Sequence, residues 1–118
     1  MESEKVMQKE IGDKQIGVII NKYRLAHRIT QEQLGELVGC SPGFVGQVER
    51  GESMPSVHIL RKIIQALDMD ANELFWETVK ASAEDEHLAN QIHHYINHMS
   101  TNEKYFILAV VSQMNILK

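Results

Sequence analysis

The residues best suited to chemistry are concentrated in one short stretch, CSPGFVGQVERG, which covers residues 40–51. Ser41 can cap a helix and Pro42 suits the first helical position, so the stretch has the form of a helix start. Two interior glycines leave few side chains, and the polar groups available are the amide of Gln47 and the guanidinium of Arg50. An amide can both donate to and accept from one adenine edge, and an Arg can pair with phosphate. If the stretch reads DNA, these two side chains are the ones suited to it.

A second group of such residues lies in HLANQIHHYINH, residues 87–98. His87, His94 and His98 are spaced by seven and four, which places them on one stripe of a helix, and a pair four apart can chelate a metal. The stripe lies beside the apolar face and no HExxH pattern is present, so a solvated flank is the favoured interpretation. A metal-binding or pH-sensing role is the alternative. We predict no metal ligand and no cofactor.

Enzymatic chemistry finds no support in the sequence, because it holds no nucleophile–base set, no Gly-rich phosphate loop and no pair of acids in a plausible cleft. The single cysteine, Cys40, excludes an internal disulfide, and its place in a turn favours burial over redox sensing. The first residues lack the apolar region of a signal peptide, and no apolar run has the length of a membrane span. We therefore expect a cytoplasmic protein that is not an enzyme.

The elements that must position these residues are helices, because apolar residues recur at helical spacing and strand-like alternation is absent. A first helix is expected to bury one face, formed by Ile16, Ile19, Ile20 and Tyr23. Thr30 and Gln33 form a capping box for a second helix of about residues 31–38, which Gly39 ends. The third helix begins at Ser41-Pro42 and stops at Gly51.

Two further helices complete this part of the chain. Gly35 is costly in the middle of the second helix, so a close approach of the third helix is expected there. Ser56 can cap a fourth helix whose inward residues are Val57, Leu60, Ile63, Ile64 and Leu67. Asp70 and Glu73 form a capping box for a fifth helix that carries Leu74, Phe75 and Trp76.

The last third of the chain predicts two more helices. Ser82 is expected to cap one whose apolar face is Leu88, Ile92, Tyr95, Ile96 and Met99. Ser100 and Glu103 form a capping box for the last, which extends to about Leu117. This helix is apolar almost all round, which predicts that a second subunit covers Tyr105, Leu108 or Ile116. Burial within the monomer, against the first and fifth helices, is the alternative.

A small residue, a turn Gly four positions later and a β-branched residue six further on form the helix-turn-helix pattern. The stretch ITQEQLGELVGCSPGFVGQVERGESMPSVHILRKIIQALDMDANELF resembles the Cro and phage-repressor (Xre-type) helix-turn-helix family. With the first helix, the resemblance covers about residues 13–76. It implies an all-α fold in which a five-helix repressor-like DNA-binding domain carries a C-terminal extension of about two helices.

The resemblance also implies roles for individual residues. Gln31 and Arg50 match positions that contact phosphate, and Gln47 matches a position that reads bases. The first turn of the recognition helix, which faces the bases, is formed by Ser41, Pro42, Gly43 and Phe44. Phe44 either contacts a thymine methyl group or packs sideways against the protein, and both interpretations stay open. Arg24 and Glu49 match an ion pair that joins the first helix to the third.

This sequence also departs from the family pattern. Pro42 and Gly43 replace hydrogen-bonding side chains, Arg28 replaces the usual Gly after the first helix, and residues 52–54 replace a loop that is often basic. The net charge is −4 overall, whereas residues 13–50 carry five Lys and Arg against four Asp and Glu. These features predict modest affinity and a shallow dependence on salt.

The sequence thus predicts a tail (1–12), a DNA-binding domain (13–76) and a helical extension (77–118) that dimerises through residues 82–118. The expected function is that of a transcriptional regulator, a repressor acting as a dimer on a double-stranded DNA operator. The alternative is a protein-interaction module or antitoxin-like partner that retains the fold, with DNA contact secondary.

Overall fold

The computed structural model describes residues 15–82 and 85–112, and every regular element in these ranges is an α-helix. Residues 15–26 form the first helix. The others are α2 (Gln31–Val38), α3 (Pro42–Glu49), α4 (Val57–Ala66), α5 (Ala71–Ser82), α6 (Glu86–Ile96) and α7 (Thr101–Ser112). The all-α prediction, with five helices followed by about two more, is confirmed.

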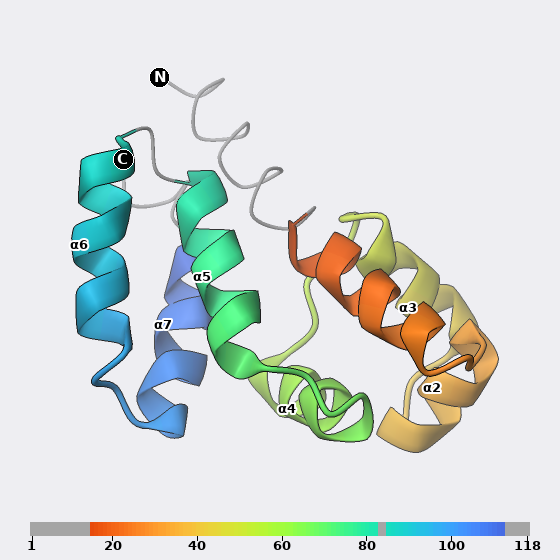
Figure 1. Ribbon diagram of the computed structural model, residues 1–118. Helices are drawn as coiled ribbons and strands as arrows, with labels where there is room; N and C mark the ends of the chain where they lie inside the picture. The colour runs from red at the N-terminus through yellow and green to blue at the C-terminus, as the bar shows by residue number, and fades with distance from the viewer. Residues whose placement is uncertain (1–14, 83–84, 113–118) are drawn as a thin grey trace.

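The helices divide the molecule into two sides (Figure 1). The first helix, α2 and α3 gather on one side, α6 lies at the opposite edge, and α5 and α7 lie between them. The packed pairs are α2 with α3, α2 with α4, α4 with α7, and α5 with both α6 and α7. The α5 helix runs through position 77, where the predicted domain boundary falls, so this boundary lies inside a helix.

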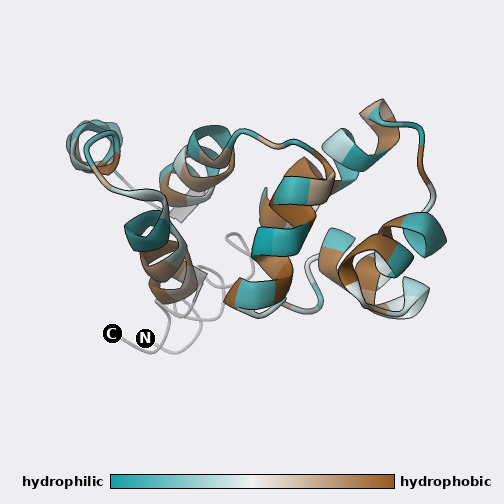
Figure 2. Ribbon diagram, turned by 90° about the horizontal axis from the view of Figure 1, so that it is seen from below, coloured by the Kyte–Doolittle hydropathy of each residue, from teal (hydrophilic) through white to brown (hydrophobic). Residues whose placement is uncertain are grey.

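One hydrophobic cluster connects all of these helices, and the apolar faces turn toward the middle of the molecule in Figure 2. Ile16 and Ile20 of the first helix, Leu34 of α2, and Leu60 of α4 are almost completely buried. Phe75 of α5 is the largest fully buried side chain. Most of the residues expected to face inward do so, and Tyr23 and Val57 are half-buried at the margin of the cluster.

The predicted starts of α2, α3, α4 and α7 are confirmed. At each of them, a side chain accepts a hydrogen bond from a backbone N–H of the first turn. Thr30 accepts from the Gln33 backbone while the Gln33 side chain accepts from the Thr30 backbone. Ser41 accepts from the backbone N–H of Phe44 at 3.1 Å. The hydroxyls of Ser56 and Ser100 cap α4 and α7 in the same way.

Two predicted caps differ from the structure. Asp70 accepts from the backbone of Asn72, but the Glu73 carboxylate is engaged by Tyr23 and Lys22 of the first helix. Ser82 does not cap α6, because α5 continues through it and Asp85 is the N-cap instead. The Asp85 carboxylate accepts from the backbone N–H of His87 at 2.8 Å.

The inward face of α6 is rotated from the predicted one. Ala89 and Ile96 are buried, whereas Leu88 and Tyr95 are 48% and 69% exposed. An aromatic contact accompanies this rotation, and the pattern of apolar residues in the sequence could not reveal it. The imidazole of His93 stacks on Trp76 of α5, with ring centroids 4.1 Å apart and planes inclined by 20°.

The α7 helix is covered largely by its own chain. Tyr105 and Leu108 are buried in the core cluster, and the Arg61 guanidinium of α4 lies over the Tyr105 ring at 5.2 Å. The prediction that a second subunit covers these two residues is therefore wrong, because α4 and α5 already do so. Phe106 is the large apolar residue of α7 that stays 68% exposed. Ile116 lies outside the described residues.

The first helix approaches α3 closely at a glycine. A Cβ added to Gly17 would lie 2.3 Å from the carbonyl oxygen of Val48 and 2.6 Å from that of Glu49. Both atoms belong to the backbone, so they could not move aside as a flexible side chain could. Gly17 therefore lets the first helix pack directly on the C-terminal turn of α3.

Candidate nucleic-acid interface

The turn between α2 and α3 fixes the angle at which α3 is presented. Gly39 adopts φ 79°, the left-handed conformation that glycine reaches at the least cost. The carbonyl of Gly35 accepts from the backbone N–H groups of Gly39 and Cys40, both at 2.8 Å. A Cβ on Gly35 would lie 2.4 Å from the Cys40 carbonyl oxygen. The expected close approach at Gly35 thus exists, but its partner is the turn rather than the third helix itself.

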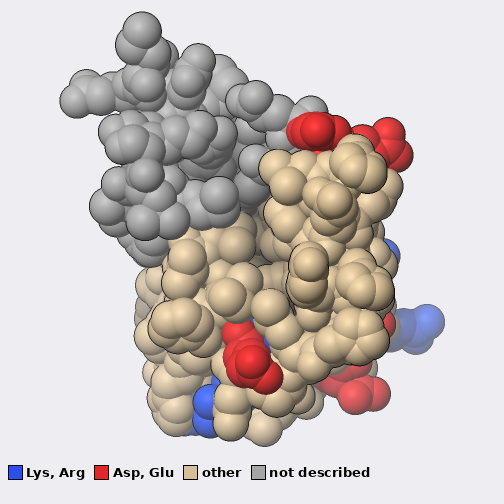
Figure 3. All heavy atoms as spheres, turned by 90° about the vertical axis from the view of Figure 1, so that its left-hand side faces the viewer, with Lys and Arg blue, Asp and Glu red and all other residues tan. Residues whose placement is uncertain are grey.

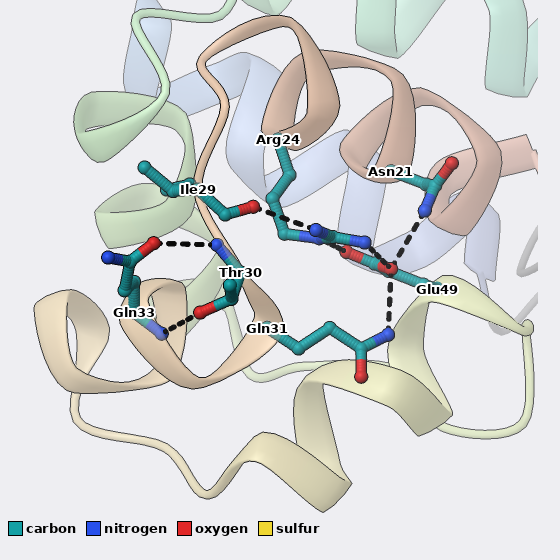
Figure 4. Close-up of polar contacts among 7 residues, drawn as sticks. All are labelled: Asn21, Arg24, Ile29, Thr30, Gln31, Gln33 and Glu49. Atoms are coloured by element: carbon teal, nitrogen blue, oxygen red, sulfur yellow. Dashed lines mark hydrogen bonds and ion pairs between the residues drawn. The ribbon is translucent and has the colours of Figure 1, made fainter.

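The C-terminal end of α3 is held by the buried carboxylate of Glu49, shown in Figure 4. Arg24 donates to it through Nε at 2.6 Å and through a second guanidinium nitrogen at 3.1 Å, and both side chains are at most 10% exposed. Asn21 donates at 2.9 Å and Gln31 at 3.1 Å. One carboxylate therefore joins the first helix, α2 and α3.

These donors also determine the charge state of Glu49. Burial by itself would raise the pKa of this carboxyl group. Hydrogen bonds from Arg24, Asn21 and Gln31 outweigh burial and hold the pKa below its ordinary value of 4.5. Glu49 is therefore ionised in the folded protein, and its charge is compensated by Arg24.

The side chains of Gln31 and Arg50 meet over Gly46. A Cβ on Gly46 would lie 3.0 Å from an Arg50 guanidinium nitrogen and 3.4 Å from the amide oxygen of Gln31. Gly46 is buried beneath them, so its missing side chain makes room for these two side chains. The structure thus brings together two residues that the resemblance associates with phosphate, one from α2 and one from α3.

The outer side of α3 is exposed where the sequence predicts base contacts. Ser41, Pro42, Gly43 and Gln47 are all exposed. Apart from its chain neighbours and the backbone of its own helix, the nearest atom to a Cβ placed on Gly43 is the Ser41 hydroxyl oxygen at 4.0 Å. The Gln47 amide oxygen accepts from the hydroxyl of Ser53 at 3.2 Å, and this bond does not use the NH₂ group of the amide. The inner side is fixed by Val45 and Val48, which are buried.

The other residues singled out on α3 and in the turn lie against the protein. Phe44 is half-buried and packs on the core cluster, as the sideways interpretation has it. Cys40 is a free thiol, half-buried against the same cluster. The Arg50 guanidinium is exposed but already paired with Glu52, with Nε 2.8 Å from the carboxylate.

The histidine stripe of α6 lies on the solvent-facing side, where His87, His94 and His98 are exposed. The rings of His94 and His98 are 5.2 Å apart between centroids. Within residues 15–82 and 85–112, no three His, Cys, Asp or Glu side chains are arranged to hold a metal ion. The same ranges contain no helix with the length and apolar character needed to cross a membrane.

Comparison with known proteins places this geometry in a family. The profile of the helix-turn-helix family matches residues 20–74, from the middle of the first helix to the first turns of α5. The chain belongs to the helix-turn-helix family of transcriptional regulators. The resemblance to Xre- and Cro-type regulators noted in the sequence is thereby confirmed.

Two relatives from Bacillus subtilis (strain 168) support the assignment. The uncharacterized HTH-type transcriptional regulator YgzD is 33% identical over 57 residues, which are 48% of this chain and 86% of the relative. The uncharacterized HTH-type transcriptional regulator YazB is 33% identical over 55 residues, which are 47% of this chain and 80% of the relative. No solved structure matches the chain significantly. Membership of this family makes a DNA-binding regulator the general function of the helix-turn-helix part.

Three residues of the interface were not singled out from the sequence. Asn21 precedes Arg24 by three positions, so helical spacing alone could have placed it on the same face. Ser53 and Glu52 follow α3 in a loop, where no periodicity indicates which way a side chain points. Their roles depend on how this loop folds back on the helix.

Proposed function

We propose that the protein is a sequence-specific DNA-binding repressor that acts as a dimer. The observation that carries the proposal is the division of α3 into two sides. Val45, Val48 and Glu49 anchor the inner side, while the outer side presents Gly43 and the Gln47 amide to solvent. A short, rigidly held helix with a free outer face is what insertion into a major groove requires.

Each predicted contact has a distinct task in this proposal. The Gln47 amide, held by Ser53, pairs with a base edge. Gln31 and Arg50, which meet over Gly46, contact phosphate on the same side of the groove. Ser41, Pro42, Gly43 and Phe44 line the first turn of α3, where the backbone comes closest to the DNA.

Few unpaired cations support this interface, so the affinity of one copy is modest. Lys22 is paired with Glu73, Arg24 with Glu49 and Arg50 with Glu52. Each cation that neutralises a phosphate makes the slope of log K for DNA binding against log salt concentration more negative by about 0.9. Because few cations are available, we expect a shallow slope. A second copy would raise the affinity by making the second contact intramolecular.

The surface proposed to hold that second copy is the exposed face of α6 and α7. Leu88 and Tyr95 of α6 and Phe106 of α7 are its exposed apolar residues. A hollow of about 300 Å³ lies beside Phe106 and is also lined by Met99, from the loop between the two helices. Figure 3 shows this side of the molecule, where the described surface is largely uncharged, with a few acidic and basic groups scattered over it. It lies on the side opposite α2 and α3, so a dimer formed there leaves both recognition helices free.

Repression is the proposed outcome, because a dimer that occupies an operator excludes polymerase from the same DNA. Selection of bound duplexes from a random DNA pool tests the function as a whole. Enrichment of a motif with two related half-sites is expected. If no duplex is enriched, the chain is instead the protein-interaction module or antitoxin-like partner that retains the fold.

The Gln47→Ala variant tests the base contact. It is expected to weaken binding to the selected duplex by about 1–3 kcal/mol, because one bidentate base contact is lost. Its loss should be smaller on non-specific DNA. Gln65→Ala, which removes an exposed amide from α4, is the matched control and should bind like the wild type. Equal affinity of Gln47→Ala and wild type for the selected duplex would remove Gln47 from the contacts.

A further inference from the structure

The loop that follows α3 folds back on the helix it leaves. Gly51 adopts φ 76°, and its backbone N–H donates to the carbonyl of Val48 at 3.0 Å. The next N–H, of Glu52, donates to the carbonyl of Gln47 at 2.8 Å. These two bonds reverse the chain, so the side chains of Glu52 and Ser53 come to lie beside the outer face of α3.

The reversed loop places a carboxylate on the phosphate-contacting Arg. Both oxygens of Glu52 accept from Arg50, one from Nε at 2.8 Å and the other from a terminal nitrogen at 3.2 Å. Glu52 thus occupies the edge formed by Nε and one terminal nitrogen, which is one of the edges through which a guanidinium can hold a phosphate at two points. The pair is exposed, with side chains 59% and 55% accessible, so DNA can reach it.

We propose that Glu52 is a built-in competitor of the DNA phosphate for Arg50, and that it limits the affinity of this protein for DNA. The inference rests on the proposed function. Besides the residues that contribute to DNA affinity, it identifies one residue that lowers this affinity. For Arg50 to bind phosphate through this edge, its bonds to Glu52 must break, and the freed carboxylate then lies close to the phosphate backbone. Glu52 therefore opposes binding both by occupying Arg50 and by its own charge.

Glu52 and Ser53 act on different neighbours, which separates affinity from sequence preference. Ser53 holds the amide of Gln47, the proposed base reader, and this bond does not involve Glu52. The backbone bond from Glu52 to Gln47 is independent of the Glu52 side chain. Replacing the carboxylate should therefore raise affinity and leave the preferred DNA sequence unchanged.

The test is a double-mutant cycle on the full chain with a duplex selected from the random pool, at low ionic strength. Glu52→Gln is expected to bind about two- to fivefold more tightly than wild type, since exposed ion pairs of this kind have small free energies. Glu86→Gln removes the same charge from an exposed position on α6 and controls for net charge. Thermal unfolding monitored by circular dichroism checks that each variant is folded.

The Arg50→Gln background distinguishes the two ways in which Glu52 could act. If Glu52 holds Arg50, most of the gain from Glu52→Gln should disappear in the Arg50→Gln/Glu52→Gln double variant. A gain of the same size in both backgrounds would mean simple repulsion of phosphate, and would overturn the proposal. A shifted base preference in Glu52→Gln would overturn it as well.

Failure of the inference and failure of the proposed function give different results. If the wild type binds the duplex, and Glu52→Gln and Glu86→Gln bind it with the same affinity as each other, only the competition by Glu52 is overturned. Wild type that binds neither a selected nor an arbitrary duplex overturns the DNA-binding function, and the competition with it.

Discussion

Gly17 and Gly43 lie in opposite surroundings, one packed against α3 and one in open space on α3 itself. Gly17 faces the backbone carbonyls of Val48 and Glu49, where no side chain fits. Gly43 lies in the first turn of α3 with open space around it. The first is required by packing, whereas the second has no packing reason and fits a role in close approach to DNA.

We expect Gly17→Ala to destabilise the protein by about 1–3 kcal/mol, because the first helix must move away from α3. Gly43→Ala is the matched control and should stabilise it by up to about 1 kcal/mol, since alanine favours a helix over glycine. Urea unfolding followed by circular dichroism measures both. Equal stability of Gly17→Ala and wild type would contradict the close approach.

The role of a glycine could not be predicted from the sequence where its contacts lie far away along the chain. Gly35 was expected to mark a close approach because it stands in a helix next to a predicted turn. Gly17 gives no such local signal, since its partners lie more than thirty positions away in α3. The side chains of Gln31 and Arg50 that cover Gly46 could not be placed from the sequence either, because they come from two different elements.

Among the elements, the position of α3 depends on one carboxylate that three helices share. Hydrogen bonds hold the pKa of Glu49 below its ordinary value of 4.5, despite its burial. The ionised form therefore stabilises the folded state fully above the unfolded pKa. This contribution declines as the pH falls through the lower, folded pKa.

Glu49→Gln is expected to lower the free energy of unfolding by about 3 kcal/mol near neutral pH, because Arg24 is left buried without its charge partner. The difference from wild type should shrink as the pH falls below 4.5. Unfolding measured across this pH range checks the prediction, with Glu36→Gln, exposed on α2, as the control. A difference that stays constant down to the acid limit would show that folding does not lower the pKa of Glu49.

Helix starts that depend on neighbours in sequence could be predicted, as the capping hydrogen bonds at Thr30, Ser41, Ser56 and Ser100 show. The start of α6 could not. Ser82 and Asp85 both suit a cap, and only the extension of α5 decides between them. The inward face of α6 was misplaced for a similar reason, because Trp76 draws His93 inward and turns Tyr95 outward.

In the whole molecule, α2 and α3 lie on the side opposite α6, which carries part of the proposed dimer surface (Figure 1). The hydrophobic core spans both, so the extension is not separable from the helix-turn-helix part by its packing. Deleting residues 100–118 would remove Tyr105 and Leu108 from this core. Such a deletion would therefore confuse loss of folding with loss of a dimer.

Surface substitutions test the dimer without disturbing the core. Tyr95→Asp and Phe106→Asp place a charge on side chains that are 69% and 68% exposed, and each is expected to shift the protein from dimer to monomer. Leu25→Asp, at a position 57% exposed on the first helix, is the control and should remain dimeric. Light scattering gives the mass in solution. A monomeric wild type, or dimers in all three variants, would rule out this surface.

The stack of His93 on Trp76 gives the molecule an intrinsic optical reporter. The chain contains a single tryptophan, and its indole lies at the contact between α5 and α6. Emission from this one fluorophore therefore follows the separation of α6 from the rest of the protein, without any attached dye. Detachment of α6 can then be followed separately from changes within residues 20–74, the part that matches the family, because that part holds no tryptophan.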